Sequence, residues 1–284
     1  MAIFSNQATL SYNGNSTNSN IAYGEILDVL VATKTAVEGS YSPGQIVTYV
    51  VTLRNTGTGT LTGLTVTDDL GGYDFGGTTV YPLNYEAGSA ALFTNGVPQA
   101  APVVAAGPPL VLTGITVPAG GDVVLVYQAR ANTYADPAAG GTIDNTVTVT
   151  GDGLSAPITA TETVTVDTEP MLTISKSITP SQVVDNDRVT YTFVIQNSGN
   201  LPVVATDNAA ITDTFDPILT DLSVTFEGAP WTQGVQYNYN ETTGLFTTVP
   251  GQILVSAATY TQDPVTGAYT ANPGVAVLTV TGTI

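Results

Sequence analysis

One block of residues occurs twice in the sequence, and this repeat limits the possible folds more than any other feature. The segment Lys34–Gly57 matches Lys176–Gly199: in each, a tyrosine follows the lysine after fifteen residues and an asparagine follows it after twenty-one. Downstream, LTVTDDL around Asp68 matches AAITDTF around Asp213. Spacing that is kept over this length predicts two copies of one domain.

The second copy is shorter than the first at its C-terminal end. The last match joins residues 121–127 to residues 274–280. Beyond it the first copy continues with two further expected strands, Ile143–Thr150 and Ile158–Val166, joined by a glycine-containing turn. The second copy reaches Ile284 before any equivalent of these two strands. We therefore expect a second domain that lacks its closing strands.

A near-copy of the missing strand lies at the other end of the chain. Residues 1–14 read MAIFSNQATLSYNG and resemble IDNTVTVTGDG of residues 143–153. The aligned pairs are Asn6 with Asn145, Ala8 with Val147, and Leu10 with Val149. Alternation of apolar and polar residues is typical of a half-buried β-strand. We expect a repeat that is circularly permuted across the chain ends, with a donor strand, or a hairpin over Ile3–Leu27, at the N-terminus.

The composition predicts an all-β chain. Its 284 residues suffice for two domains with separate cores. Threonine and valine are abundant, glycine and proline recur at short intervals, and no long stretch has helical spacing. We expect two tandem immunoglobulin-like antiparallel β-sandwiches. The predicted parts are a donor strand or hairpin over residues 1–27, a first domain over 28–166, and a second domain over 167–284.

Several classes of function are disfavoured by what the chain lacks. It has no Cys and no His, and its net charge is −18. Disulfides, thiolate metal sites and histidine-based nucleophile pairs are therefore unavailable, and the acidic surface repels nucleic acid. We expect no enzyme activity, no cofactor, no nucleic-acid partner and no membrane-spanning segment. Binding of Ca²⁺ stays open as an alternative, with carboxylate ligands among Asp68, Asp69, Asp74, Asp185, Asp187, Asp207, Asp213, Asp216 and Asp221.

A family resemblance is carried by the segment LVATKTAVEGSYSPGQIVTYVVTLRNTGTGTLTGLTVTDDL. It resembles the bacterial surface-repeat family called domain of unknown function 11, whose pattern runs Lys-Thr, Gly-x-x-Val-Thr-Tyr, Asn-Thr-Gly, Val-Thr-Asp and a closing Asn-Thr-x-x-Val strand. The resemblance covers Leu30–Thr150 and Leu172–Ile284. It implies an immunoglobulin-like repeat of cell-surface or appendage proteins, without established enzymatic activity. The second copy departs from the pattern because the closing strand is missing.

A sandwich without its closing strand leaves an unpaired sheet edge and an open apolar groove, which another chain can fill by adding a strand. Such a contact joins two different surfaces, so it propagates as an open filament. We predict a structural subunit of an extracellular, pilus-like filament on a cell or spore surface. It is a homopolymer in which each N-terminal strand enters the second domain of its neighbour. The predicted interface residues are Ile3, Phe4, Asn6, Ala8, Leu10 and Tyr12.

Three alternatives to this assembly stay open. In the first, residues 1–27 are only an appendage of the first domain. In another, the sequence is a piece of a longer repeat array. In the third, the protein is a surface adhesin or glycan-binding module that does not polymerise.

The two lysines of the chain, Lys34 and Lys176, occupy the same position in the two copies. With an acid and an asparagine they resemble the sets that form isopeptide bonds in Gram-positive pilins. The sets are Lys34 with Asp68 and Asn145, and Lys176 with Asp213 and Asn6 of a neighbouring subunit. Alternatively, each lysine is simply ion-paired with its aspartate, and each asparagine caps backbone groups at a strand end.

Overall fold

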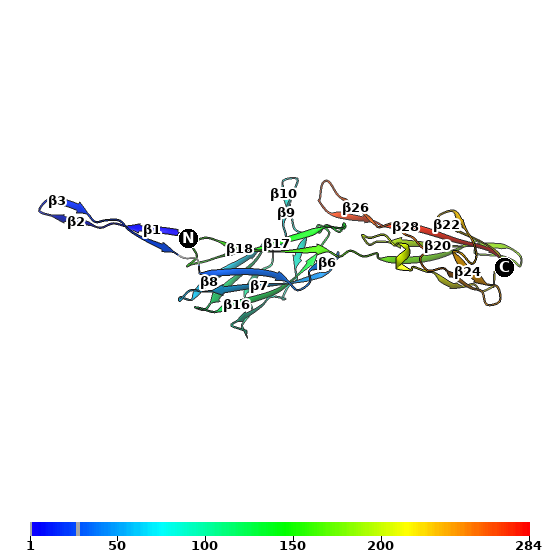
Figure 1. The fold of residues 1–284 in the computed structure, drawn as a ribbon, viewed down its shortest axis with the longest axis horizontal. Coiled ribbons are helices and arrows are strands. Elements are labelled where there is room, and N and C mark those ends of the chain that lie inside the picture. Colours follow the sequence, from blue (N-terminus) through cyan, green and yellow to red (C-terminus); the bar gives the residue numbers. More distant parts are fainter. Residues whose placement is uncertain (1, 27–28) are drawn as a thin grey trace. The chain divides into compact units, whose positions relative to one another are not determined.

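The computed structural model describes residues 2–26 and 29–284, so Met1, Leu27 and Asp28 lie outside the described residues. The described chain is built from β-strands, with one short 3-10 turn, η1 (Ala205–Asp207), and no α-helix (Figure 1). It divides into two compact units, Met1–Asp136 with Thr142–Thr165, and Pro137–Gly141 with Val166–Ile284. Among the described residues there is no helix that is long and apolar enough to cross a membrane.

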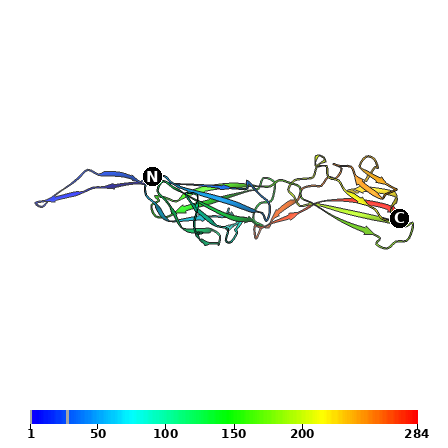
Figure 2. The same cartoon turned by 90° about the horizontal axis from the view of Figure 1, so that it is seen from below.

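The N-terminal residues form a two-stranded ribbon, the hairpin that the sequence predicts (Figure 1, Figure 2). Strand β1 (Ala2–Asn6) pairs with β4 (Ala22–Ile26), and β2 (Thr9–Tyr12) pairs with β3 (Asn15–Asn18). The reversal at Asn13–Gly14 has positive φ at both residues, as a tight hairpin turn requires. Every residue from Phe4 to Tyr23 is exposed, and these four strands pair only with one another among the described residues.

Unit 1 is a sandwich of two antiparallel sheets. The first has the order β13-β12-β16-β7-β5, with β11 also paired to β16. Its strands are β5 (Leu30–Ala36), β7 (Ile46–Asn55), β11 (Leu83–Tyr85), β12 (Ala91–Thr94), β13 (Val97–Pro98) and β16 (Asp122–Ala131). The second has the order β14-β15-β8-β17-β18-β6. Its strands are β6 (Ser40–Tyr41), β8 (Leu61–Asp68), β14 (Val103–Ala105), β15 (Leu110–Val117), β17 (Thr142–Thr150) and β18 (Ile158–Val166). A separate hairpin joins β9 (Tyr73–Phe75) to β10 (Thr78–Val80).

The core of unit 1 lies between these sheets and follows from alternation along the strands. Every second side chain of β7 from Val47 to Leu53 is fully buried, as is every second one of β16 from Val123 to Ala129. Strand β17 contributes Val147 from the opposite sheet. Burying an aliphatic side chain of this size contributes about 1.5–3 kcal/mol, so the alternating faces hold the two sheets together.

Unit 2 repeats the first sheet of unit 1 but not the second. Its larger sheet has the order β19-β20-β28-β22-β23, and Leu172 pairs with Asn197 as Leu30 pairs with Asn55 in unit 1. These strands are β19 (Leu172–Thr179), β20 (Arg188–Asn197), β22 (Thr220–Phe226), β23 (Ala229–Trp231) and β28 (Gly274–Thr283). The other sheets are β21-β25-β24 and β26-β27, with β21 (Thr212–Thr214), β24 (Tyr237–Asn240), β25 (Leu245–Thr248), β26 (Thr259–Gln262) and β27 (Tyr269–Asn272).

The strand pair β17–β18 has no counterpart in the described part of unit 2. In unit 1, β8 lies between β15 and β17. Strand β21 contains Asp213, which corresponds to Asp68 of β8, and it pairs only with β25 among the described residues. One edge of β21 is therefore left without a neighbouring strand, as the shortened second copy predicts.

Candidate functional site

The first lysine site lies inside the core of unit 1. Lys34 projects inward from β5 and Asp68 from the end of β8, with Nζ and Oδ2 2.7 Å apart and both side chains fully buried. Asp68 also accepts hydrogen bonds from the Leu70 backbone N–H, at 2.7 Å, and from the Tyr127 hydroxyl. The Lys34 Nζ stands 4.7 Å from the centre of the Tyr49 ring. The ion pair is thus enclosed by aromatic side chains.

Burial controls the protonation of this cluster. Loss of hydration lowers the pKa of Lys34, although the charge and hydrogen bond of Asp68 act in the opposite direction. The pKa of Tyr127 is raised, first by burial and then by the negative charge of Asp68. Both effects favour the uncharged forms of the Lys34 amine and the Tyr127 hydroxyl.

Asn145 faces the same interior from β17, on the face that carries Val147 and Val149. Asn145 is fully buried, and neither the nitrogen nor the oxygen of its side-chain amide has a hydrogen-bond partner among the described residues. Burial raises the pKa of the Tyr49 hydroxyl, and the nearby Asn145 amide partly opposes that rise. Because neither group completes a hydrogen bond, we interpret this as proximity only. The Thr146 N–H donates to Asp69 Oδ1 at 2.9 Å, which holds β17 against the corner that begins at Asp68.

The structure therefore buries all three members of the first predicted set in unit 1 and decides part of the alternative interpretation. Lys34 and Asp68 do form an ion pair. Asn145, however, does not cap backbone groups, since its amide has no partner among the described residues. Tyr127 was not singled out from the sequence, and Tyr49 only as a marker of the repeat. A tyrosine follows the lysine at the same spacing in both copies, and this signal could have placed Tyr49 at the site.

The second lysine site is only half built. Lys176 of β19 forms an ion pair with Asp213 of β21, but 39% of the lysine side chain is exposed. The Lys176 Nζ lies 4.5 Å from the centre of the Tyr191 ring, with Phe193 and Phe215 also beside it. The predicted third member, Asn6, lies on exposed strand β1 and pairs with Ala22. The described strands of unit 2 include no equivalent of β17, the strand that carries Asn145 in the first site.

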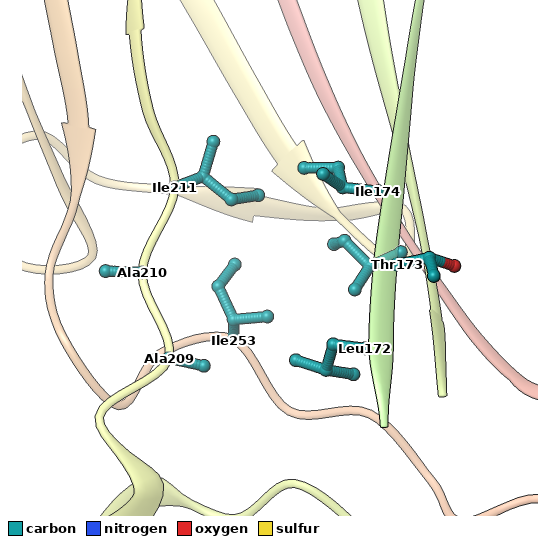
Figure 3. Close-up of a pocket in the computed structure, with 8 residues that line it drawn as sticks. Leu172, Thr173, Ile174, Ala209, Ala210, Ile211 and Ile253 are labelled. Carbon is teal, nitrogen blue, oxygen red and sulfur yellow. The ribbon is translucent and has the colours of Figure 1, made fainter. Parts of the chain in front are cut away.

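An apolar groove adjoins the unpaired edge of unit 2. Strand β19 is exposed along its whole length: Leu172 is 42% exposed and Ile174 is 55% exposed, whereas Leu30 at the position of Leu172 is 4% exposed. A cavity of about 150 Å³ opens there. In Figure 3 the labelled isoleucines and Leu172 point toward one another across it. Its lining residues are Leu172, Thr173, Ile174, Ile195, Ala209, Ala210, Ile211 and Ile253.

Unit 1 shows what occupies the corresponding place. There β17 pairs with β8, with Val147 opposite Asp68 and Val149 opposite Val66, and both valines are fully buried. Asp213 and Ile211 are the equivalents of Asp68 and Val66 in unit 2. Because Ile211 lines the groove, the groove borders the segment that corresponds to the part of β8 paired with β17.

The predicted donor residues all belong to the exposed hairpin. Phe4, Leu10 and Tyr12 are large apolar side chains exposed to solvent, and Asn6 and Ala8 are exposed as well. For Ile3 the structure describes the backbone, which pairs with Glu25, while its side chain lies outside the description. An exposed apolar ribbon and an empty apolar groove are thus both present in one chain.

No family model matches the sequence, and no curated protein matches it. Among solved structures, the chain is similar to a 35 kDa C-terminal fragment of the major pilin GBS80 of Streptococcus agalactiae, at 12% identity and a TM-score of 0.36, covering 87% of this chain and 91% of that one. It is also similar to the pilus backbone RrgB of Streptococcus pneumoniae, at 10% identity and a TM-score of 0.35, covering 86% of this chain and 55% of that one.

A third similar structure is the N-terminal domain of the Streptococcus gordonii adhesin Sgo0707, at 18% identity and a TM-score of 0.35. That match covers 54% of this chain and 36% of the adhesin chain. At such identities and scores these likenesses establish no function for this chain, and the resemblance to the surface-repeat family stays a prediction. The described residues include no group of three acidic side chains arranged to hold a metal ion, so Ca²⁺ binding stays a prediction without an assigned site.

Proposed function

We propose that this chain is a structural subunit of a surface filament, assembled head-to-tail when the N-terminal hairpin of one copy enters the groove of unit 2 in the next. The single observation that carries the proposal is the exposure of β19: all of its residues are exposed, whereas Leu30 and Lys34 of β5 are buried. The resemblance to a family of surface repeats supports a location outside the cell, on an appendage of a cell or spore.

The hairpin has the form of the strand pair that unit 2 lacks. In unit 1, β17 and β18 are antiparallel neighbours, with Asn145 opposite Glu162. In the hairpin, Asn6 lies opposite Ala22 and Thr9 opposite Asn18, again in two antiparallel strands. A donated hairpin would therefore supply equivalents of both missing strands, with its first strand against β21.

The alignment of the N-terminal strand with β17 predicts which side chains enter the groove. Ala8 is placed opposite Asp213 and Leu10 opposite Ile211, as Val147 and Val149 are placed in unit 1. Leu10 is 63% exposed in the free hairpin. Burying it with Phe4 and Ala8, and covering Ile174 in return, stabilises the contact by roughly 5–8 kcal/mol before the cost of ordering the strand. This gain suffices for a specific contact because the hairpin is already formed.

Removal of residues 2–14 tests the proposal. We expect the intact protein to form filaments visible by electron microscopy and the truncated protein to stay monomeric, because its groove has no strand to accept. The control is a full-length variant with residues 2–14 in scrambled order, which keeps length and charge and should also stay monomeric. A synthetic peptide of residues 2–18 should bind the truncated protein in a one-to-one ratio. Filaments of the truncated protein would contradict strand donation, and an intact protein that stays monomeric would favour the adhesin alternative.

The same register places Asn6 of the donor beside Lys176 and Asp213 of the acceptor. Condensation of the lysine amine with the asparagine amide, with release of one ammonia, would then join neighbouring subunits covalently. We expect intact filaments to run as a ladder of oligomers on a gel after boiling in detergent, and Asn6→Ala filaments to dissociate to monomers. Asn18→Ala, on the return strand, should keep the ladder. Wild-type filaments that dissociate completely would refute the bond but leave the noncovalent contact in place.

A further inference from the structure

We propose that Lys34 and Asn145 of unit 1 condense spontaneously into an isopeptide bond that joins β5 of the first sheet to β17 of the second. The reaction is intramolecular, so it does not depend on filament assembly. Three features of the described structure carry the inference: a buried lysine, a buried acid in contact with it, and a buried amide that has no partner.

The unpartnered amide is the least expected of these features. Buried side-chain amides in folded proteins almost always have hydrogen-bond partners, because an unsatisfied polar group loses its hydration without compensation. Both amide atoms of Asn145 lack a partner among the described residues, although the side chain lies near the Tyr49 hydroxyl. An amide that reacts with the lysine would account for this lack of a partner, because the reaction consumes it. Condensation removes the amide nitrogen and converts the carbonyl into part of a new secondary amide.

The lysine is positioned as the nucleophile. Its Nζ lies 2.7 Å from Asp68 Oδ2, close enough for a proton to pass from the ammonium group to the carboxylate. That transfer leaves a neutral amine and a neutral carboxylic acid, and burial favours this uncharged pair because it lowers the pKa of Lys34. The Tyr49 and Tyr127 rings enclose the pair, so bulk water does not compete for the amide.

Each atom and proton of the step is accounted for. The Nζ lone pair attacks Cγ of Asn145, and the protonated Asp68 donates a hydrogen bond to the carbonyl oxygen, which stabilises the negative charge that develops there. Asp68 then passes its proton to the departing amide nitrogen and, as a carboxylate again, takes one proton from the attacking nitrogen. The Cγ–Nδ2 bond breaks, a Cγ–Nζ bond forms, and one ammonia leaves. The step needs no oxidant, no reductant and no cofactor.

The mass of the purified full-length protein tests the bond. We expect the denatured, intact chain to weigh about 17 Da less than its sequence requires, the mass of one ammonia. Digestion with a protease that does not cut at lysine should give a branched peptide that contains both Lys34 and Asn145. Lys34→Met, which keeps an apolar chain of similar length, and Asn145→Ala should both have their full sequence mass. Lys176→Met should keep the loss, because it leaves unit 1 unchanged.

The outcomes separate this bond from other reactions. Loss of the same mass in Lys34→Met would mean that ammonia leaves by cyclisation of an asparagine and would overturn the proposal, as would a wild-type chain of full mass. Circular dichroism of each variant shows whether it is folded, and Asp68→Asn is a further variant that should lack the bond. Because the measurement needs no filaments, its failure is distinguishable from failure of strand donation.

Discussion

Leu10→Asp is expected to abolish filament assembly, whereas Thr9→Asp is expected to leave it largely intact. Leu10 corresponds to Val149, which is fully buried against the opposite sheet in unit 1. An aspartate there would bring an unpaired charge to a groove lined by Ile174, Ile211 and Ile253. The variant also loses the free energy gained by burying the leucine side chain. The contact should therefore weaken at least 100-fold, or by about 3 kcal/mol. Thr9 faces the other way and loses only its hydrogen bond to Asn18, 2.8 Å long in the free hairpin.

Light scattering against protein concentration measures the effect as a rise in the concentration needed for assembly. Equal effects of Leu10→Asp and Thr9→Asp would show that the predicted register is wrong, since a shift by one residue exchanges the two faces of a strand. Each variant must first be shown to keep a folded unit 1 and unit 2 by thermal unfolding. This is expected, because both substitutions lie on the exposed hairpin.

A complementary variant on the acceptor side sharpens this experiment. Ile174→Asp changes a residue that is 55% exposed in the free subunit, so it should fold, but it should not accept a donor strand. Leu10→Asp keeps a working groove and Ile174→Asp keeps a working donor. A mixture of the two should therefore form dimers that do not extend, while each alone stays monomeric. Filaments from the mixture would contradict a head-to-tail contact of these two surfaces.

Much of this arrangement could be predicted from the sequence because the repeat supplies its own internal reference. The alternation in Ile46–Asn55 fixes which side chains enter the core, and the resemblance to isopeptide-forming sets associates Lys34 with Asp68, its partner in the structure. The fold class and the hairpin follow from the same alternation and from the tight Asn13–Gly14 turn.

Burial could not be predicted in the same way. Lys34 and Lys176 occupy equivalent positions, yet the first is enclosed and the second is partly exposed. The difference comes from strand β17, which is distant in sequence from Lys34 and has no equivalent in the described part of unit 2. A side chain takes its environment from such long-range neighbours, and the local sequence does not contain them.

The middle part of each copy was also beyond sequence reasoning. The segments between Tyr73 and Val103, and between Ala229 and Tyr269, do not match each other and have short, irregular patterns. In the structure they form small hairpins such as β9–β10 and β26–β27. The unpartnered amide of Asn145 could likewise not be predicted from the sequence, which favoured capping of backbone groups at a strand end.

Asn145→Ala is expected to lower the unfolding temperature of unit 1 by roughly 10–20 °C. In the wild-type chain the proposed bond closes a loop of about 110 residues, which restricts the unfolded state by about 4–5 kcal/mol in a chain-entropy treatment. Differential scanning calorimetry of the full-length protein measures the shift. Lys34→Met should cause a loss of similar size, because it removes the same bond. Lys176→Met should leave the unit 1 transition unchanged. A shift below a few degrees in both unit 1 variants would indicate that no bond restrains the wild-type chain.

The pH dependence of Asn145→Ala separates loss of the bond from loss of packing. Without the bond, Lys34 has a free amine whose pKa is lowered in the folded state by burial. The unfolded chain then binds more protons, so the stability of this variant rises with pH up to the unfolded lysine value of about 10.4. The other groups facing this amine, Asp68, Asp69, Glu162, Tyr49 and Tyr127, are present in all three chains, and only Asn145→Ala combines them with a free Lys34 amine. Wild type, whose amine is consumed, and Lys34→Met, which has none, should lack this rise between pH 7 and pH 9. An equal rise in all three chains would place its origin elsewhere and leave Lys34 of the wild type unreacted.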